Sequence, residues 1–219
     1  MTTPRAVIFD VNETLLDLSA LDPLFEQFYG DASTRLRWFT LLKEWWLVGN
    51  ATGTYRPFDV LVEQALLAID EDKVLTARER KEFMQGLTSL PPHEDVRPAL
   101  KTLSEAPLRV AALTNGTDDA VKKQLTNAGL LKYFDLVLST DSVQRHKPDK
   151  SPYLHAAKSL NISVEHCVMI AAHDWDIAGA AEAGLQTAFI ERPGAPYAPI
   201  YPTPTYRCTT LHEVAELFR

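Results

Sequence analysis

Cysteine is nearly absent from this sequence, which has only Cys167 and Cys208 in 219 residues. A secreted disulfide framework or a zinc site needs more cysteines at closer spacing, so neither is expected. Cys167 begins the apolar run 167–172 and is expected to be a small buried residue. The sequence also lacks any run approaching the ~20 apolar residues that a membrane-spanning helix requires. These absences predict a globular protein with reduced cysteines.

Basic residues are in the minority, since 22 Lys and Arg stand against 29 Asp and Glu, with a net charge of −7. Phosphate backbones are bound by clusters of Lys and Arg, and no strong cluster is present, so a nucleic-acid surface is not expected. Asp10 interrupts the first apolar run, which argues against a signal peptide. The chain shows no internal repeats. We expect a cytoplasmic protein that binds neither nucleic acid nor membrane.

The apolar residues that are present follow two patterns. Residues 5–10 form a short unbroken run, typical of a strand buried on both faces of a parallel sheet. Residues 15–91 contain no such run, but their apolar positions recur at helical spacing. Four helices are expected in this stretch, and they cover about 22–28, 36–50, 58–69 and 77–87.

After Pro91-Pro92 the pattern becomes a regular alternation of strands and helices. The expected strands cover 109–113, 136–138, 167–172, 187–190 and about 207–208. The expected helices cover 98–106, 118–128, 151–160, 176–183 and 211–218. Alternation of this kind predicts an α/β fold with a doubly wound parallel sheet. Residues 1–14 and 92–219 would form the core domain, and residues 15–91 an inserted all-helical cap over the carboxyl ends of the strands, where ligands bind.

Polar side chains follow four of the predicted strands, and the ends of parallel strands meet at one edge of the sheet. They are Asp10 and Thr14, then Thr114 and Asn115, then Lys147, and finally His173, Trp175 and Asp176. Each one alone has an ordinary explanation, such as a helix cap, a turn or a solvated loop. Acids, a lysine and small polar groups that converge at one edge favour an active site instead.

Four segments in this order resemble the motifs of the haloacid dehalogenase superfamily. They are residues 9–17, 113–116, 147–149 and 174–179. The resemblance covers the whole chain, including a helical cap inserted after the first strand. It implies a Rossmann-like haloacid dehalogenase core.

Two positions bear on whether this member would be a phosphatase or a dehalogenase. Phosphatases of the superfamily carry a second Asp where this chain has Asn12, which cannot protonate a leaving group. They also carry an acidic magnesium ligand where this chain has Ala172. Both differences count against a phosphatase, because the phosphate charge would lack compensation. A Mg²⁺-dependent small-molecule phosphatase and a non-catalytic binding module stay as alternatives.

The closest resemblance within the superfamily is to the type II (S)-2-haloacid dehalogenases. In that family an Asp attacks C2 of a 2-haloalkanoate and expels halide, and water hydrolyses the resulting ester to a 2-hydroxy acid. By motif, the resemblance implies Asp10 as the nucleophile and Thr14 as its hydrogen-bonding neighbour. Lys147 would hold Asp10 ionised, Asp176 would position or deprotonate the water, and Tyr153 would support the lysine region.

The resemblance also implies a site for the substrate and its halide. Thr114 stands where a family Ser helps to hold the substrate carboxylate, and Asn115 and Trp175 match part of the halide cradle. Arg37 is favoured as the cap arginine of that cradle, with Arg35 as the competitor and a plain helix-surface arginine as the ordinary alternative.

The sequence departs from the family around the nucleophile. Asn12 and Glu13 replace a Tyr-Gly pair and change the pocket floor, and His173 replaces an Asn that helps to hold the water. Asn12 and His173 are still expected to line the substrate site. The resemblance implies no metal and no cofactor. The expected partners are a small 2-haloacid, such as a haloacetate or 2-halopropionate, the released halide, and a second copy of the chain in a homodimer.

Overall fold

The computed structural model describes residues 2–69 and 74–219 and contains a six-stranded parallel sheet. The strands are β1 (Ala6–Phe9), β2 (Arg109–Thr114), β3 (Leu136–Ser139), β4 (Cys167–Ala171), β5 (Gln186–Ile190) and β6 (Tyr206–Cys208). Their spatial order is β3-β2-β1-β4-β5-β6, which is the order of a doubly wound α/β fold. The predicted fold class is therefore confirmed.

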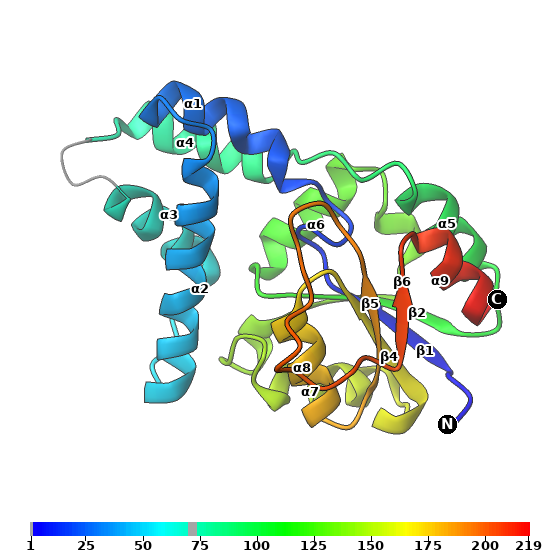
Figure 1. The fold of residues 1–219 in the computed structure, drawn as a ribbon. Helices are drawn as coiled ribbons and strands as arrows, with labels where there is room; N and C mark the ends of the chain where they lie inside the picture. The colour runs from blue at the N-terminus through cyan, green and yellow to red at the C-terminus, as the bar shows by residue number, and fades with distance from the viewer. Residues whose placement is uncertain (1, 70–73) are drawn as a thin grey trace.

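Helices cover both faces of the sheet, as the alternating pattern predicts (Figure 1). They are α5 (Val96–Ser104), α6 (Asp118–Asn127), α7 (Lys150–Leu160), α8 (Asp174–Glu182) and α9 (Leu211–Phe218). Helices α5, α6 and α9 pack in one buried cluster with Val7 and Phe9 of β1. Helices α7 and α8 pack in the other with Ala6 and Ile8. Successive side chains of a strand point to opposite faces, so β1 is buried on both sides.

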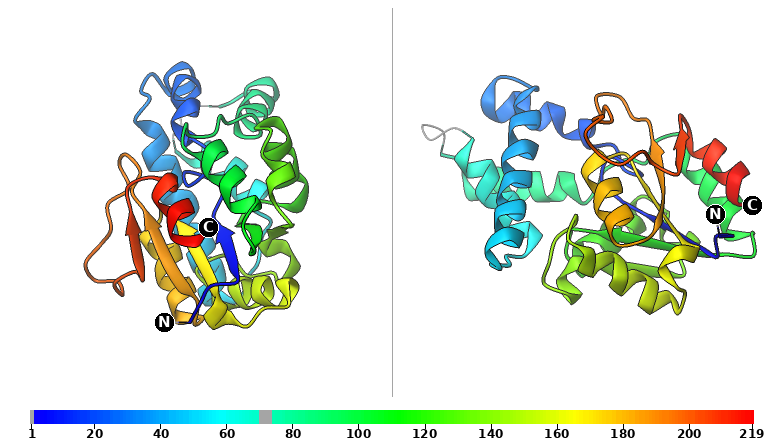
Figure 2. Two further views of the ribbon diagram at one scale, coloured as in Figure 1. Left: turned by 90° about the vertical axis from the view of Figure 1, so that its right-hand side faces the viewer. Right: turned by 60° about the horizontal axis from the view of Figure 1, so that its bottom comes forward.

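Four helices form the inserted stretch and lie together beside the sheet. They are α1 (Asp22–Tyr29), α2 (Thr34–Thr52), α3 (Phe58–Ala68) and α4 (Ala77–Leu87). Figures 1 and 2 show them on the side of the sheet away from the N-terminus. Because β1 runs from that terminus toward the helices, the carboxyl ends of the parallel strands face the cap. The domain boundaries proposed from the sequence stay a prediction.

Helices α5 and α8 are among those that begin earlier than the sequence suggests. Helix α5 starts at Val96 and not at Pro98, because a proline in the first turn lacks only an N–H that has no helical partner. Helix α8 starts at Asp174, after His173 in extended backbone. Asp176 is therefore inside the first turn of α8 and does not cap it. Over the described residues, no helix has both the length and the hydropathy needed to cross a membrane.

Candidate active site

Asp10 lies immediately after β1 and is 5% exposed. Three side chains contact its carboxylate. Lys147 Nζ donates to Oδ1 over 2.7 Å, and Thr14 Oγ1 donates to Oδ2 over 2.7 Å. His173 Nδ1 lies 3.3 Å from Oδ2. Burial alone would raise the pKa of Asp10, but Lys147 and His173 outweigh it and hold the pKa below its ordinary value.

Lys147 is fully enclosed and bridges two carboxylates. Its ammonium donates over 2.7 Å to Asp10 Oδ1, over 2.7 Å to Asp176 Oδ2, and over 3.0 Å to the Leu113 carbonyl. All three N–H donors therefore have acceptors. Burial opposes the charge of Lys147, yet Asp10 and Asp176 raise its pKa above the ordinary value. The lysine is thus a fixed positive charge beside Asp10.

Asp176 supports this lysine from α8. Its Oδ2 accepts from Lys147, and its Oδ1 accepts from the Tyr153 hydroxyl over 2.6 Å. Asp176 has no exposed surface, and burial raises the pKa of its carboxyl although Lys147 opposes the shift. Both of its oxygens are committed to side chains that are themselves buried. Tyr153 therefore contacts Asp176, the partner of the lysine, and its supporting role stays a prediction.

The His173 ring lies between two aromatic rings, and its two nitrogens contact two acids. Its ring stacks on Trp175 at 4.8 Å and on Phe39 of α2 at 5.6 Å between centroids. Nδ1 faces Asp10, and Nε2 lies 2.7 Å from Glu13 Oε2. Burial would lower the pKa of His173, but the hydrogen bonds to Asp10 and Glu13 raise it to about 9. The imidazole is therefore a cation at neutral pH.

A cluster of unsatisfied polar groups lies next to Asp10. Asn115 Oδ1 accepts from the Lys147 backbone N–H over 2.8 Å, whereas Asn115 Nδ2 is buried with no hydrogen-bond partner among the described residues. The buried indole N–H of Trp46 is in the same condition. A buried donor without a partner costs about 1–3 kcal/mol, so it commonly marks the place of a missing acceptor.

A small cavity of about 20 Å³ joins these groups. Its walls are Asp10, Asn12, Phe39, Trp46, Phe58, Thr114, Asn115, Lys147, His173 and Trp175. The volume holds about one water molecule. Side chains of α2 and α3 close the cavity from the cap side, so a larger ligand requires movement of this aromatic wall. Neither Asp176 nor Tyr153 lines it.

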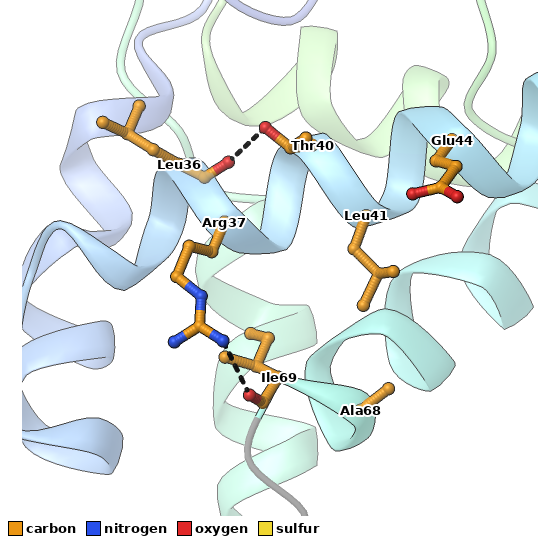
Figure 3. Close-up of a pocket in the computed structure, with 7 residues that line it drawn as sticks. All are labelled: Leu36, Arg37, Thr40, Leu41, Glu44, Ala68 and Ile69. Atoms are coloured by element: carbon orange, nitrogen blue, oxygen red, sulfur yellow. Dashed lines mark hydrogen bonds between the residues drawn. The ribbon is translucent and has the colours of Figure 1, made fainter.

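The structure brings together every site residue expected from the sequence except Arg37. Its guanidinium donates to the Ile69 carbonyl over 3.4 Å, within a separate cavity of about 500 Å³ between α2 and α3 (Figure 3). That cavity shares no residue with the one at Asp10. Arg35 contacts two acids instead, and its guanidinium lies 3.4 Å from Glu13 and 2.5 Å from Asp22. Residues two positions apart lie on different faces of a helix, so the two arginines diverge, and the assignment of the halide-cradle arginine stays a prediction.

Glu13 contacts the site, although the sequence analysis assigned it no role. It contacts His173 and Arg35, and its backbone φ is 63°, a left-handed conformation that is costly for a residue with a side chain. The signal in the sequence was an acid three residues after Asp10, at a position where the resembling family has Gly.

A buried carboxylate kept ionised by a lysine, with buried donors beside it that have no partner among the described residues, is the arrangement that an aspartate nucleophile would need. The family model for haloacid dehalogenase-like hydrolases matches residues 4–184. The chain belongs to this family, as the motifs predicted.

Several characterised relatives match over nearly the whole chain. The (S)-2-haloacid dehalogenase of Pseudomonas sp. (strain YL) is 28% identical and covers 98% of this chain and 94% of its own. The haloacetate dehalogenase H-2 of Moraxella sp. (strain B) is 27% identical, with 97% of each chain covered. The L-2-haloacid dehalogenase structure from Xanthobacter autotrophicus with chloropropionic acid covalently bound superposes with a TM-score of 0.92 at 21% identity, over 98% of both chains.

Proposed function

We propose that this hydrolase is a metal-independent dehalogenase of short 2-haloalkanoic acids. The observation that carries the proposal is the Lys147 ammonium, which lies 2.7 Å from Asp10 in a cavity that Asn115 also lines. Asn115 Nδ2 has no hydrogen-bond partner among the described residues. An ionised nucleophile and a free donor for a departing anion are the two features that halide displacement needs. The names of the relatives from Pseudomonas and Moraxella support the same substrate class.

The chemistry has two halves. In the first, an oxygen of Asp10 attacks C2 of the haloacid, a C–O bond forms as the carbon–halogen bond breaks, and the electron pair leaves with the halide. In the second, water attacks the carbonyl carbon of the Asp10 ester and releases the 2-hydroxy acid. Asn115 Nδ2 and the edge of Trp175 receive the halide, and Thr114 with Asn12 faces the substrate carboxylate. Arg37 has no part in this proposal, because it bonds elsewhere in the cap.

The size of the cavity supports a short substrate. The aromatic side chains Phe39, Trp46 and Phe58 leave about 20 Å³ above Asp10. A haloacetate or 2-halopropionate needs a modest shift of this wall, whereas a long chain would have to displace it. Water excluded by the same wall strengthens the attack of the carboxylate.

The alternative, a magnesium-dependent phosphatase, finds no support from the surroundings of Asp10. Asn12 has no proton for a leaving group, and its amide oxygen accepts from Gln124 over 3.1 Å. Ala172 offers no carboxylate, and its backbone N–H donates to Thr14 over 2.9 Å. The position between Asp10 and Asp176 is filled by Lys147. A divalent cation there would face the charge of the lysine.

The deciding experiment measures halide release from chloroacetate and 2-chloropropionate in the presence of EDTA. We expect multiple turnovers at a rate that added Mg²⁺ leaves unchanged. An assay of phosphate monoesters with Mg²⁺ runs in parallel. Release of phosphate, or no halide from any short haloacid, would sink the proposal.

Replacement of the nucleophile gives the first residue-level prediction. Asp10→Asn should abolish turnover, since an amide cannot form the ester, whereas the control Asp119→Asn on the exposed start of α6 should keep the wild-type rate. Single turnover of the wild type in H₂¹⁸O, followed by mass spectrometry of the peptide that contains Asp10, should place the label in that residue. Label found only in the product would contradict attack by Asp10.

A further inference from the structure

The second half of the proposed reaction needs a base near Asp10, and the geometry does not favour Asp176. The base must reach a water that attacks the Asp10 carbonyl carbon. Asp176 does not line the cavity, and both of its oxygens already accept hydrogen bonds, from Lys147 and Tyr153. Each oxygen keeps a second lone pair, but the Asp176 carboxylate has no exposed surface and does not face the cavity from which the water would attack.

His173 meets the geometric requirement. Its ring lines the cavity, and Nδ1 lies 3.3 Å from Asp10 Oδ2. Stacking between Trp175 and Phe39 fixes the plane of the ring. A water that approaches the Asp10 carbonyl from the cavity comes within reach of this nitrogen.

Glu13 connects the other side of the imidazole to solvent. Its Oε2 lies 2.7 Å from His173 Nε2, and Arg35 holds its Oε1 at 3.4 Å. The Glu13 side chain is 25% exposed and lines a second, polar cavity of about 240 Å³, together with Arg35, His93 and Arg192. A continuous path of hydrogen-bonding groups therefore runs from the buried nucleophile to a wet surface.

We propose that His173 and Glu13 form a catalytic dyad in which His173 takes the proton of the hydrolytic water and Glu13 passes protons between the imidazole and the second cavity. The inference rests on the proposed function, because it concerns the hydrolysis of the Asp10 ester. His173 is the catalytic base, and Glu13 is a positioning residue that acts through it.

The protons balance over one turnover. At rest His173 is protonated and Asp10 is ionised. Ester formation removes the negative charge of Asp10, so the cation loses one partner and releases its proton through Glu13 to solvent. The neutral ring then takes a proton from the attacking water as the C–O bond forms. Collapse of the tetrahedral intermediate returns the alkoxide, which gains the proton of the new Asp10 carboxyl group. The net products are the 2-hydroxy acid, halide and one proton.

The charges around His173 are compatible with this order of proton transfers. His173 faces the acids Asp10 and Glu13, with Lys147 beyond Asp10 and Arg35 beyond Glu13. The nearby Asp174 carboxylate is turned toward backbone N–H groups of Trp175 and Ala198. Since the two acids raise the pKa of His173 to about 9, loss of the Asp10 charge brings it back toward neutrality.

The backbone of Glu13 provides an independent observation. Its φ of 63° lies in the left-handed region, which is unfavourable for a residue with a Cβ and which a glycine would adopt without strain. Strain of this kind persists where the surrounding structure requires it, often at active sites. The conformation brings the Glu13 carboxylate onto His173.

The test separates the two half-reactions with rapid quench and intact-protein mass spectrometry. His173→Gln should still give a burst of about one halide per enzyme and then accumulate the alkylated protein, with hydrolysis slowed about 10²-fold or more. Asp176→Asn serves as the comparison and should not accumulate the ester. Accumulation in Asp176→Asn but not in His173→Gln would overturn the assignment.

The role of Glu13 is tested by the pH dependence of ester hydrolysis, which would not change if Glu13 were only structural. In the wild type, the hydrolysis rate should rise with pH through the ionisation of His173 in the ester intermediate. Glu13→Gln should shift this profile to lower pH and slow hydrolysis, and Glu13→Asp should restore part of both. An unchanged profile in Glu13→Gln would contradict the dyad.

A titration of the resting enzyme by NMR of its histidine side chains is independent of turnover. His173 should titrate near 9 in the wild type and lower in Glu13→Gln. A His173 that titrates near the ordinary value of about 6.5 would overturn the dyad, whatever the substrate. If the titration is as expected but no haloacid releases halide, the proposed function fails and takes the hydrolytic role of His173 with it.

Discussion

At the scale of single residues, the site is a balanced set of buried charges. Two carboxylates, Asp10 and Asp176, meet two cations, Lys147 and His173, in a region that water reaches poorly. Burial of isolated charges is costly, and only close partners offset that cost. The arrangement favours the ionised form of the Asp10 carboxylate, which is the form that the proposed attack requires.

The charge of His173 predicts a pH dependence of stability. Its folded pKa of about 9 lies above the unfolded value, so its contribution is fully present below pH 6.5 and disappears as the pH rises through 9. The loss is on the order of 3 kcal/mol in the free energy of unfolding. Urea denaturation of the wild type between pH 6 and 10 should show this fall, and His173→Gln should lack the part due to His173. Parallel curves for the two proteins would contradict a charged resting imidazole.

At the scale of elements, the aromatic residues of α2 act on both the cap and the site. Trp38 packs within the cap against Phe25 of α1 at 5.7 Å and Phe83 of α4 at 5.3 Å, and its indole N–H donates to Val62 of α3. Farther along the same helix, Trp46 packs against Trp175 of α8 at 5.5 Å. The helix thereby joins the cap interior to the wall of the active site.

Trp38 is therefore expected to hold the cap together. Trp38→Ala should lower the free energy of unfolding by about 3–5 kcal/mol, since it leaves a cavity where α2 meets three other helices. Leu36→Ala, on the same helix at a side chain 60% exposed, should change it by less than about 0.5 kcal/mol. Chemical denaturation of both variants checks the difference. A similar effect from the two substitutions would show that Trp38 is not central to cap packing.

A second element-scale feature is the close approach of α8 to Lys147-Pro148. A Cβ on Gly179 would lie 2.5 Å from Pro148 Cβ, so only glycine permits this packing. The approach brings Asp176, one turn earlier on α8, to the Lys147 ammonium. The glycine of the fourth motif thus serves the charge network without touching a substrate.

At the scale of the whole molecule, Arg192 joins segments that are far apart in the sequence and contacts the loop that carries Thr14. After β5 its guanidinium donates to both oxygens of Asp95 at 2.9 Å and to the carbonyl of Thr14. Asp95 also accepts from the backbone of Leu211 at the start of α9. Segments distant in sequence are thereby fixed around Thr14, which donates a hydrogen bond to Asp10. The homodimer implied by the family resemblance stays a prediction.

Arg192→Met should lower the free energy of unfolding by about 3 kcal/mol, because it leaves Asp95 poorly exposed and without its cation. Turnover should also fall, since the loop that carries Thr14 loses two donors. The control is Arg207→Met, which breaks an exposed ion pair with Glu191 and should cost less than about 1 kcal/mol. Equal stabilities of the two variants would argue against this role.

The strand ends and their polar residues could be predicted because local patterns determine them. An apolar run such as 6–9 is compatible with few structures other than a buried strand, and parallel strands bring Asp10, Asn115, Lys147 and Asp176 to one edge. Local patterns could not predict which side of α2 faces the site. Arg35 and Arg37 have similar neighbours in the sequence, and only the packing of α2 on α3 sends Arg37 to Ile69.

The sequence by itself determined the order of strands and helices, the family, and the set of groups that meet Asp10, because each depends on local periodicity and chain order. Only the tertiary structure decided how those groups contact one another and which of them face the cavity. Asp176 is enclosed by Lys147 and Tyr153, while His173 faces the cavity and reaches Glu13. These contacts depend on the distance between segments about 160 residues apart and on the burial of their side chains. Local sequence does not encode either quantity.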